Sequence, residues 1–126
     1  MITRVHSTTV TVSDQDKALD FYVNTLGWKT SIDNPMGPEM RFLTVAPGDG
    51  ATELVLGLAS WTGREVGGET GITLVSDDIE ADYQRLSGKG VRFKGPVEQM
   101  PWGQKAVWFF DPDGNEFFLV DGEYRP

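Results

Sequence analysis

Cysteine is absent from this chain of 126 residues. Its absence excludes disulfide bonds, thiolate metal ligands and cysteine nucleophiles, and it is typical of a cytoplasmic protein. His6 is the one histidine, so we do not expect a nucleophile activated by an imidazole base. The sequence also contains no glycine-rich phosphate loop of the P-loop type and no GxSxG turn. It therefore lacks the motifs typical of P-loop nucleotide-binding enzymes and of α/β-hydrolases.

Positive charge and long apolar runs are also scarce. The chain has 11 Lys and Arg against 19 Asp and Glu, a formal net charge of −8. A nucleic-acid partner is not expected, because phosphate binding needs clustered Lys and Arg, whereas the acidity mildly favours cationic ligands. No apolar run approaches the roughly 18 residues of a membrane-spanning helix. Since Met1 to Arg4 lead directly into strand-like sequence, we expect no signal peptide either, and a cytoplasmic location.

An internal repeat is the most informative feature that is present. Val12-Ser13-Asp14 recurs as Val75-Ser76-Asp77, a shift of 63 residues, and Gly27 pairs with Gly90 at the same shift. Each copy has the pattern of a strand, a capped helix, a glycine stop and further strands, which is βαβββ. A duplicated unit of this kind usually buries its apolar face with the help of its copy. We therefore predict a single α+β domain over 1–126, with module 1 over 3–58, a linker over 59–69 and module 2 over 70–121.

Periodicity and turn residues predict the elements of each copy. Alternation of period two indicates a strand, and Ser13 followed by Asp16 resembles a capping box at a helix start. Glycine is favoured where a helix ends, because it adopts a left-handed backbone. The first copy is predicted to hold strands over 3–12, 28–32, 40–46 and 52–58, with a helix from Ser13 to Gly27. The second is predicted to hold strands over 71–75, 91–93, 105–110 and 116–120, with a helix marked by Ile79, Tyr83 and Leu86.

Three short motifs, taken in order, resemble a known family. They are Phe21-Tyr22 followed by Leu26-Gly27, Asp77-Asp78-Ile79 entering a helix, and Asp111-Pro112-Asp113-Gly114-Asn115 before the last strand. Their order and spacing, over roughly residues 3–121, are similar to those of the vicinal-oxygen-chelate superfamily of glyoxalase I, extradiol dioxygenases, epimerases, fosfomycin-resistance enzymes and bleomycin-resistance proteins. The resemblance implies two tandem βαβββ modules forming a curved, half-open sheet around a cavity, and a homodimer. Because this fold hosts many chemistries, it does not give the function.

The resemblance also implies four metal-ligand positions, which fall on Ser7, Glu53, Gly71 and Phe118. Glu53 is the one good ligand among them, since glycine and phenylalanine offer no side-chain donor and a neutral serine hydroxyl is a poor one. We therefore expect no metal and no other cofactor. The alternative is a divalent metal held by His6, Glu53 and Glu116. Strand alternation argues against it, because His6 should point away from the side to which Ser7 points.

Aromatic and acidic residues dominate the positions that should face the cavity. Trp108 and Phe110 share one strand face, Glu116 and Phe118 share another, and Trp102 lies in a loop. Such a set suits a flat hydrophobic or cationic ligand, although Trp108 and Phe110 could instead be core residues and Glu116 a partner for a lysine. The tryptophans outside strands, Trp61 and Trp102, are less readily explained as core. The predicted ligand-binding residues are Ser7, Glu53, Trp102, Trp108, Phe110, Glu116 and Phe118.

Two functions from different classes remain. The first is a metal-independent binding protein, similar to the bleomycin-resistance branch, that takes a small hydrophobic or cationic molecule into an acidic aromatic cleft. The second is an enzyme of the glyoxalase or dioxygenase type, a lyase, isomerase or oxygenase, with an atypical divalent-metal site around Glu53. In that second case Glu53 and Glu116 are the candidate catalytic residues, because paired carboxylates can perform acid–base chemistry when one has a raised pKa. We favour binding over catalysis, since three of the four ligand positions lack a good ligand.

Overall fold

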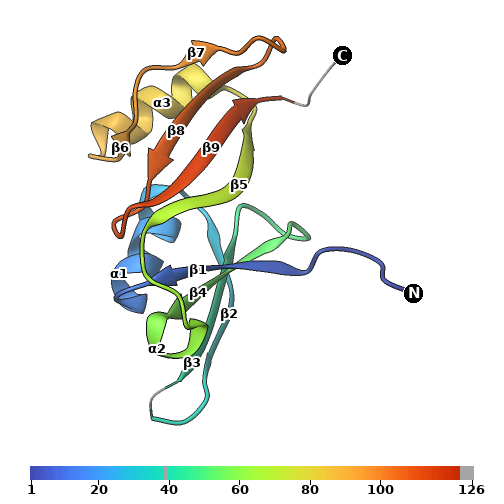
Figure 1. Cartoon of the computed structure of the whole chain (residues 1–126), viewed down its shortest axis with the longest axis vertical. Coiled ribbons are helices and arrows are strands. Elements are labelled where there is room, and N and C mark those ends of the chain that lie inside the picture. The colour runs from blue at the N-terminus through green and yellow to red at the C-terminus, as the bar shows by residue number, and fades with distance from the viewer. Residues whose placement is uncertain (39, 123–126) are drawn as a thin grey trace. The chain divides into compact units, whose positions relative to one another are not determined.

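The computed structural model describes residues 1–38 and 40–122. The chain forms two compact units, Met1–Gly67 and Gly68–Pro126, and each contains one β-sheet, with several short helices in the first unit and the helix α3 in the second (Figure 1). Both sheets are open, because each ends in unpaired edge strands and does not close into a barrel. The mixed α+β fold predicted from the repeat is confirmed. Among the described residues, no helix combines the length and apolarity needed to cross a membrane.

The first unit contains a four-stranded sheet in the order β1-β4-β3-β2. β1 is parallel to β4, whereas β3 runs antiparallel to both β2 and β4. Its core is apolar, with Tyr22, Leu43 and Val45 fully buried. The buried side chain of Gln15 joins the first helix to the sheet by donating to the carbonyl oxygens of Leu56 at 2.8 Å and Arg41 at 2.9 Å. The elements are β1 (Ser7–Val12), α1 (Gln15–Asp20), the π-helix η1 (Phe21–Thr25), β2 (Lys29–Pro35), β3 (Arg41–Ala46), β4 (Glu53–Leu58) and α2 (Ala59–Thr62).

Several of the predicted boundaries in this unit are wrong, and β2 continues to Pro35, beyond its predicted end at residue 32. The first strand begins at Ser7 and not at residue 3, because residues 1–6 are exposed and have no buried face to align. The cap of α1 is Asp14 and not Ser13, since the Asp14 side chain accepts a hydrogen bond from the backbone N–H of Lys17 at 3.0 Å. Gly27 ends the helical segment with a φ of 84°, as predicted.

The segment predicted as a linker, 59–69, contains the short helix α2 and the start of the next strand. Glycine at position 57 allows this, because an added Cβ would lie 2.7 Å from the indole ring of Trp61 and 2.7 Å from the methyl group of Thr62. Trp61 therefore packs onto the backbone of β4, and a hydrogen bond of 2.9 Å joins the hydroxyl groups of Thr11 and Thr62. This packing accounts for a tryptophan that periodicity did not assign to the core.

The second unit contains a sheet in the order β5-β9-β8-β6, with β7 also paired to β8. β5 is parallel to β9, and β8 runs antiparallel to β9. Strand β7 was predicted as loop, and it is a two-residue pairing that has no periodicity to detect. The elements are β5 (Gly68–Ser76), α3 (Ile79–Gly88), β6 (Arg92–Phe93), β7 (Glu98–Gln99), β8 (Lys105–Phe110) and β9 (Asn115–Asp121).

The two faces of this second sheet differ in burial. One face is covered by α3, and its side chains Val107, Phe109 and Phe117 are almost fully buried. The rings of Phe109 and Phe117 stack with their centroids 5.5 Å apart, and Phe93 links Phe109 to Tyr83 of the helix. On the opposite face Ala106 and Val120 are buried, but the large side chains of Trp108, Phe110 and Phe118 are only partly buried. Large aromatic side chains on that face are therefore free to contact a ligand.

Candidate functional site

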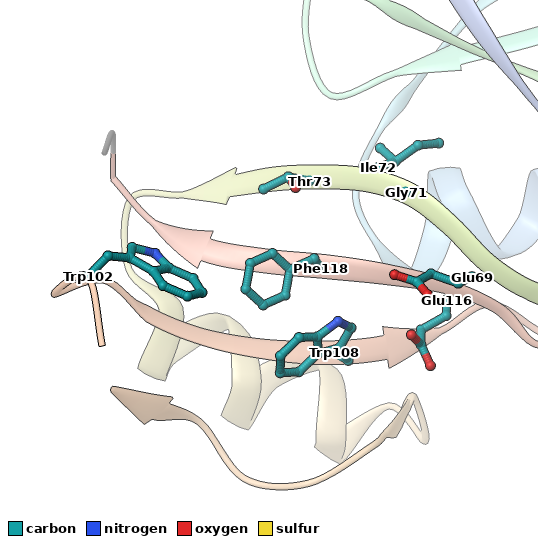
Figure 2. A pocket seen from close by; sticks show the side chains of 8 residues that line it. All are labelled: Glu69, Gly71, Ile72, Thr73, Trp102, Trp108, Glu116 and Phe118. Atoms are coloured by element: carbon teal, nitrogen blue, oxygen red, sulfur yellow. The ribbon is translucent and has the colours of Figure 1, made fainter. Parts of the chain in front are cut away.

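A pocket of about 240 Å³ lies on the partly buried face of the second unit's sheet. Figure 2 shows its aromatic side chains along β8, β9 and the loop before β8, with two carboxylates gathered at one end. Pockets that bind small molecules are typically apolar hollows with a few placed polar groups, and this one has that composition. It is lined by Glu69, Gly71, Ile72, Thr73, Trp102, Trp108, Glu116 and Phe118.

The aromatic walls are held in place by the register of the sheet and by a tight hairpin. Trp108 and Phe118 are direct partners across β8 and β9, with ring centroids 4.4 Å apart. Trp102 remains 45% exposed, and its ring lies 6.5 Å from that of Phe118. Its indole Nε1 donates to Oε1 of Gln104 at 2.9 Å. The loop tryptophan is thus positioned before any ligand arrives, which lowers the entropic cost of binding.

A bulge in β5 forms the wall opposite these rings. Glu69 pairs with Glu116 and Thr73 with Phe118, so three residues of β5 lie opposite the single residue Phe117. The side-chain hydroxyl of Thr70 replaces the lost ladder bonds by donating to the carbonyl oxygen of Glu116 at 2.7 Å. Gly71 has a φ of 72°, a left-handed conformation that favours glycine. Bulges often re-aim side chains beside functional sites, and four residues at this one, Glu69, Gly71, Ile72 and Thr73, line the pocket.

Two carboxylates lie at one end of the pocket (Figure 2). Glu69 and Glu116 are Cα partners on neighbouring parallel strands, where like charges repel. Nζ of Lys94 lies 3.2 Å from Oε1 of Glu116, whose side chain is only 11% exposed. Glu69 has no ion-pair partner within the described ranges 1–38 and 40–122. The lysine and the two glutamates together leave one uncompensated negative charge at this end.

The four expected metal positions do not offer a suitable set of donors. Ser7 and Glu53 are partners on β1 and β4, but Oε1 of Glu53 accepts a 2.7 Å hydrogen bond from the hydroxyl of buried Thr44. Gly71 and Phe118 lie at the pocket and present no donor atoms in their side chains. Within the described part of the chain, no three His, Asp or Glu side chains are grouped so that they could hold a metal ion. His6 is exposed and lies just outside β1. The direction of its side chain therefore cannot be inferred from alternation along that strand.

The structure brings together four of the predicted ligand-binding residues, Trp102, Trp108, Glu116 and Phe118. Ser7 and Glu53 belong to the first unit. Phe110 is not among the lining residues, and the guanidinium carbon of Arg92 lies 5.2 Å from its ring centroid. Glu69, Ile72 and Thr73 were missed. The nearby glycines 67, 68 and 71 were the available signal for an irregular strand, but they do not specify which side chains it presents.

The comparisons with known proteins agree with this architecture. Residues 4–119 match the family model described as the Glyoxalase/Bleomycin resistance protein/Dioxygenase superfamily. The chain belongs to this superfamily. The chain is also 36% identical to the uncharacterized protein YetH of Bacillus subtilis (strain 168), over 96% of this chain and 100% of YetH.

Two solved structures of the superfamily are similar to the chain over almost its whole length. A glyoxalase/bleomycin resistance protein/dioxygenase superfamily member from Sphaerobacter thermophilus DSM 20745 is 56% identical, with a TM-score of 0.92 over 96% of this chain and 98% of that one. TnmS3 from Streptomyces sp. CB03234, described as an antibiotic binding protein, is 41% identical, with a TM-score of 0.84 over 97% and 98% of the two chains. The resemblance drawn from the three sequence motifs is therefore confirmed.

Proposed function

We propose that this protein binds a small, flat, positively charged molecule in the pocket of its second unit, without a metal ion. The observation that carries the proposal is the pairing of Trp108 and Phe118 beside the neighbouring carboxylates of Glu69 and Glu116. Aromatic faces attract cations and supply contact area, with each cation–π contact worth about 0.5–2 kcal/mol. The largely buried carboxylate of Glu116 and the exposed carboxylate of Glu69 would add charge pairing to a ligand that carries its charge at one end.

The electrostatics of the pocket support a cation over a neutral ligand. Two carboxylates on adjacent strands repel each other in the free protein, and Lys94 compensates only one of them. A bound cation would relieve this repulsion, whereas a neutral ligand would not. The acidic chain, with a net charge of −8, would also attract cations over longer distances.

Metal independence is supported by the donors that the chain presents. Gly71 and Phe118 stand at two of the expected ligand positions and offer no side-chain donor atom. The carboxylate of Glu53, at a third position, accepts a hydrogen bond from the hydroxyl of Thr44. A catalytic site that activates water or chelates a substrate normally needs three protein ligands. We therefore place this protein with the binding members of its superfamily, as TnmS3 is described to be. The family resemblance further implies a homodimer, which sedimentation velocity would test.

Calorimetric titration with two planar probes of the same ring system tests the proposal. N-methylacridinium carries a fixed positive charge, and acridine at pH 8 is neutral. We expect N-methylacridinium to bind more tightly by a factor of about ten, the equivalent of one or two favourable charge contacts. Glu69→Gln should reduce this preference, and Glu98→Gln, a carboxylate outside the pocket lining, should leave it unchanged. Equal affinity for the two probes, or no binding of either, would overturn the proposal.

A further inference from the structure

Lys94 is a cation that forms an ion pair with Glu116, a residue that lines the proposed site, although Lys94 is not itself among the lining residues. It directly follows β6, and its backbone N–H donates to the carbonyl oxygen of Trp108 at 2.9 Å, which fixes the backbone beside the pocket wall. Its ammonium group reaches Oε1 of Glu116 at 3.2 Å while its side chain remains 60% exposed. The lysine is therefore anchored at its backbone and free to move at its tip.

The partners of this ion pair differ in how easily each can leave. Glu116 belongs to β9 in the centre of the sheet, and its side chain is 11% exposed. Lys94 can rotate its ammonium group into water at little cost, because long exposed side chains gain rotamer freedom when they are released. A ligand cation that approaches Glu116 would thus compete with Lys94 and not with a rigid part of the protein.

We propose that Lys94 acts as an internal counterion that determines which ligand charge the pocket prefers. The inference rests on the proposed function and goes beyond it by assigning a residue to specificity. With Lys94 in place, Glu69 and Glu116 leave a single net negative charge, which matches a monocation. Loss of the lysine charge leaves two negative charges, so the pocket becomes better suited to cations of every charge and gains most for a dication.

Charge-neutral substitution of the lysine tests this role. We compare wild type with Lys94→Gln by calorimetry, using N-methylacridinium, acridine and the dication N,N′-dimethyl-4,4′-bipyridinium as probes. Lys94→Gln should bind N-methylacridinium about three- to fivefold more tightly and gain more for the dication, with no change for acridine. Lys105→Gln is the matched control, because Lys105 pairs with Glu80 of α3, on the helix-covered side of the sheet, and is absent from the pocket lining. Lys105→Gln removes the same charge as Lys94→Gln and should leave the affinities for all three probes unchanged.

A double-mutant cycle shows whether the effect passes through Glu116. In the Glu116→Gln background, Lys94→Gln should produce no gain for either cation, because the carboxylate that the lysine neutralises is gone. Equal gains from Lys94→Gln and Lys105→Gln, a gain that extends to acridine, or a gain that survives in the Glu116→Gln background would each overturn the role of Lys94. Wild-type preference for N-methylacridinium would still support the proposed function in those cases. Circular dichroism of each variant checks that the fold is retained.

Discussion

Replacing Trp108 by leucine should weaken binding of N-methylacridinium about five- to thirtyfold. Trp108 lies on β8 with its ring centroid 4.4 Å from that of Phe118, so the two rings form a continuous aromatic wall. Leucine retains much of the apolar contact and removes the π face, whose attraction for a cation is about 1–2 kcal/mol in a partly desolvated site. At 25 °C that free energy corresponds to the stated loss in affinity. Isothermal titration calorimetry measures it directly.

Two controls separate loss of the π face from loss of structure. Trp108→Phe keeps an aromatic face at the same position and should cost less than about threefold. Neutral acridine should lose less affinity than N-methylacridinium on Trp108→Leu, because it makes no cation–π contact. The reasoning would be refuted if Trp108→Leu, folded by circular dichroism, bound N-methylacridinium as tightly as wild type, or if Trp108→Phe lost as much affinity as Trp108→Leu.

Three further predictions concern stability and metal content. Gly57→Ala should destabilise the protein by about 1–3 kcal/mol in urea unfolding, because the new methyl group meets the Trp61 ring at 2.7 Å, and an unchanged midpoint would contradict that packing. The hydrogen bond from Arg41 lowers the pKa of Asp33 below its ordinary value of 3.8. The ionised Asp33 therefore stabilises the folded state at pH values above 3.8, and this stabilisation is lost as the pH falls through the lowered pKa. The difference in thermal stability between wild type and Asp33→Asn should therefore shrink in acid, and a difference that is constant from pH 6 to pH 2 would refute this linkage. Elemental analysis of purified protein should find no stoichiometric divalent ion, whereas an ion that is removed by chelator and lost in Glu53→Gln would favour the alternative enzymatic function.

The repeat made the order of elements predictable, because each copy carries the local signals that end a helix. Gly27 and Gly90 adopt nearly the same left-handed conformation, with φ of 84° and 86°. The helix caps are less regular, since Asp14 caps α1 but Asp78 and not Asp77 caps α3. Glycine stops depend on backbone sterics alone, whereas either of two adjacent polar residues can supply a cap.

Strand alternation pointed to Trp108, Phe118 and Glu116, which all line the pocket, but it did not point to Glu69. Alternation put Trp108 with Phe110 along β8 and Phe118 with Glu116 along β9, and the register of the structure then pairs Trp108 with Phe118 across the sheet. Glu69 was missed because its position depends on the bulge in β5, which is stabilised by a side-chain hydrogen bond from Thr70 to a strand distant in sequence. The pairing of Lys94 with Glu116 also joins distant segments. Such contacts follow from tertiary register, which periodicity within a strand does not encode.

A crystal structure of the protein with N-methylacridinium bound tests the central claim most directly. Electron density should place the flat rings against the indole of Trp108 and the ring of Phe118, with the methylated nitrogen toward Glu69 and Glu116. Density for the probe at another surface, or a metal ion coordinated in the pocket where the cationic nitrogen should lie, would contradict it.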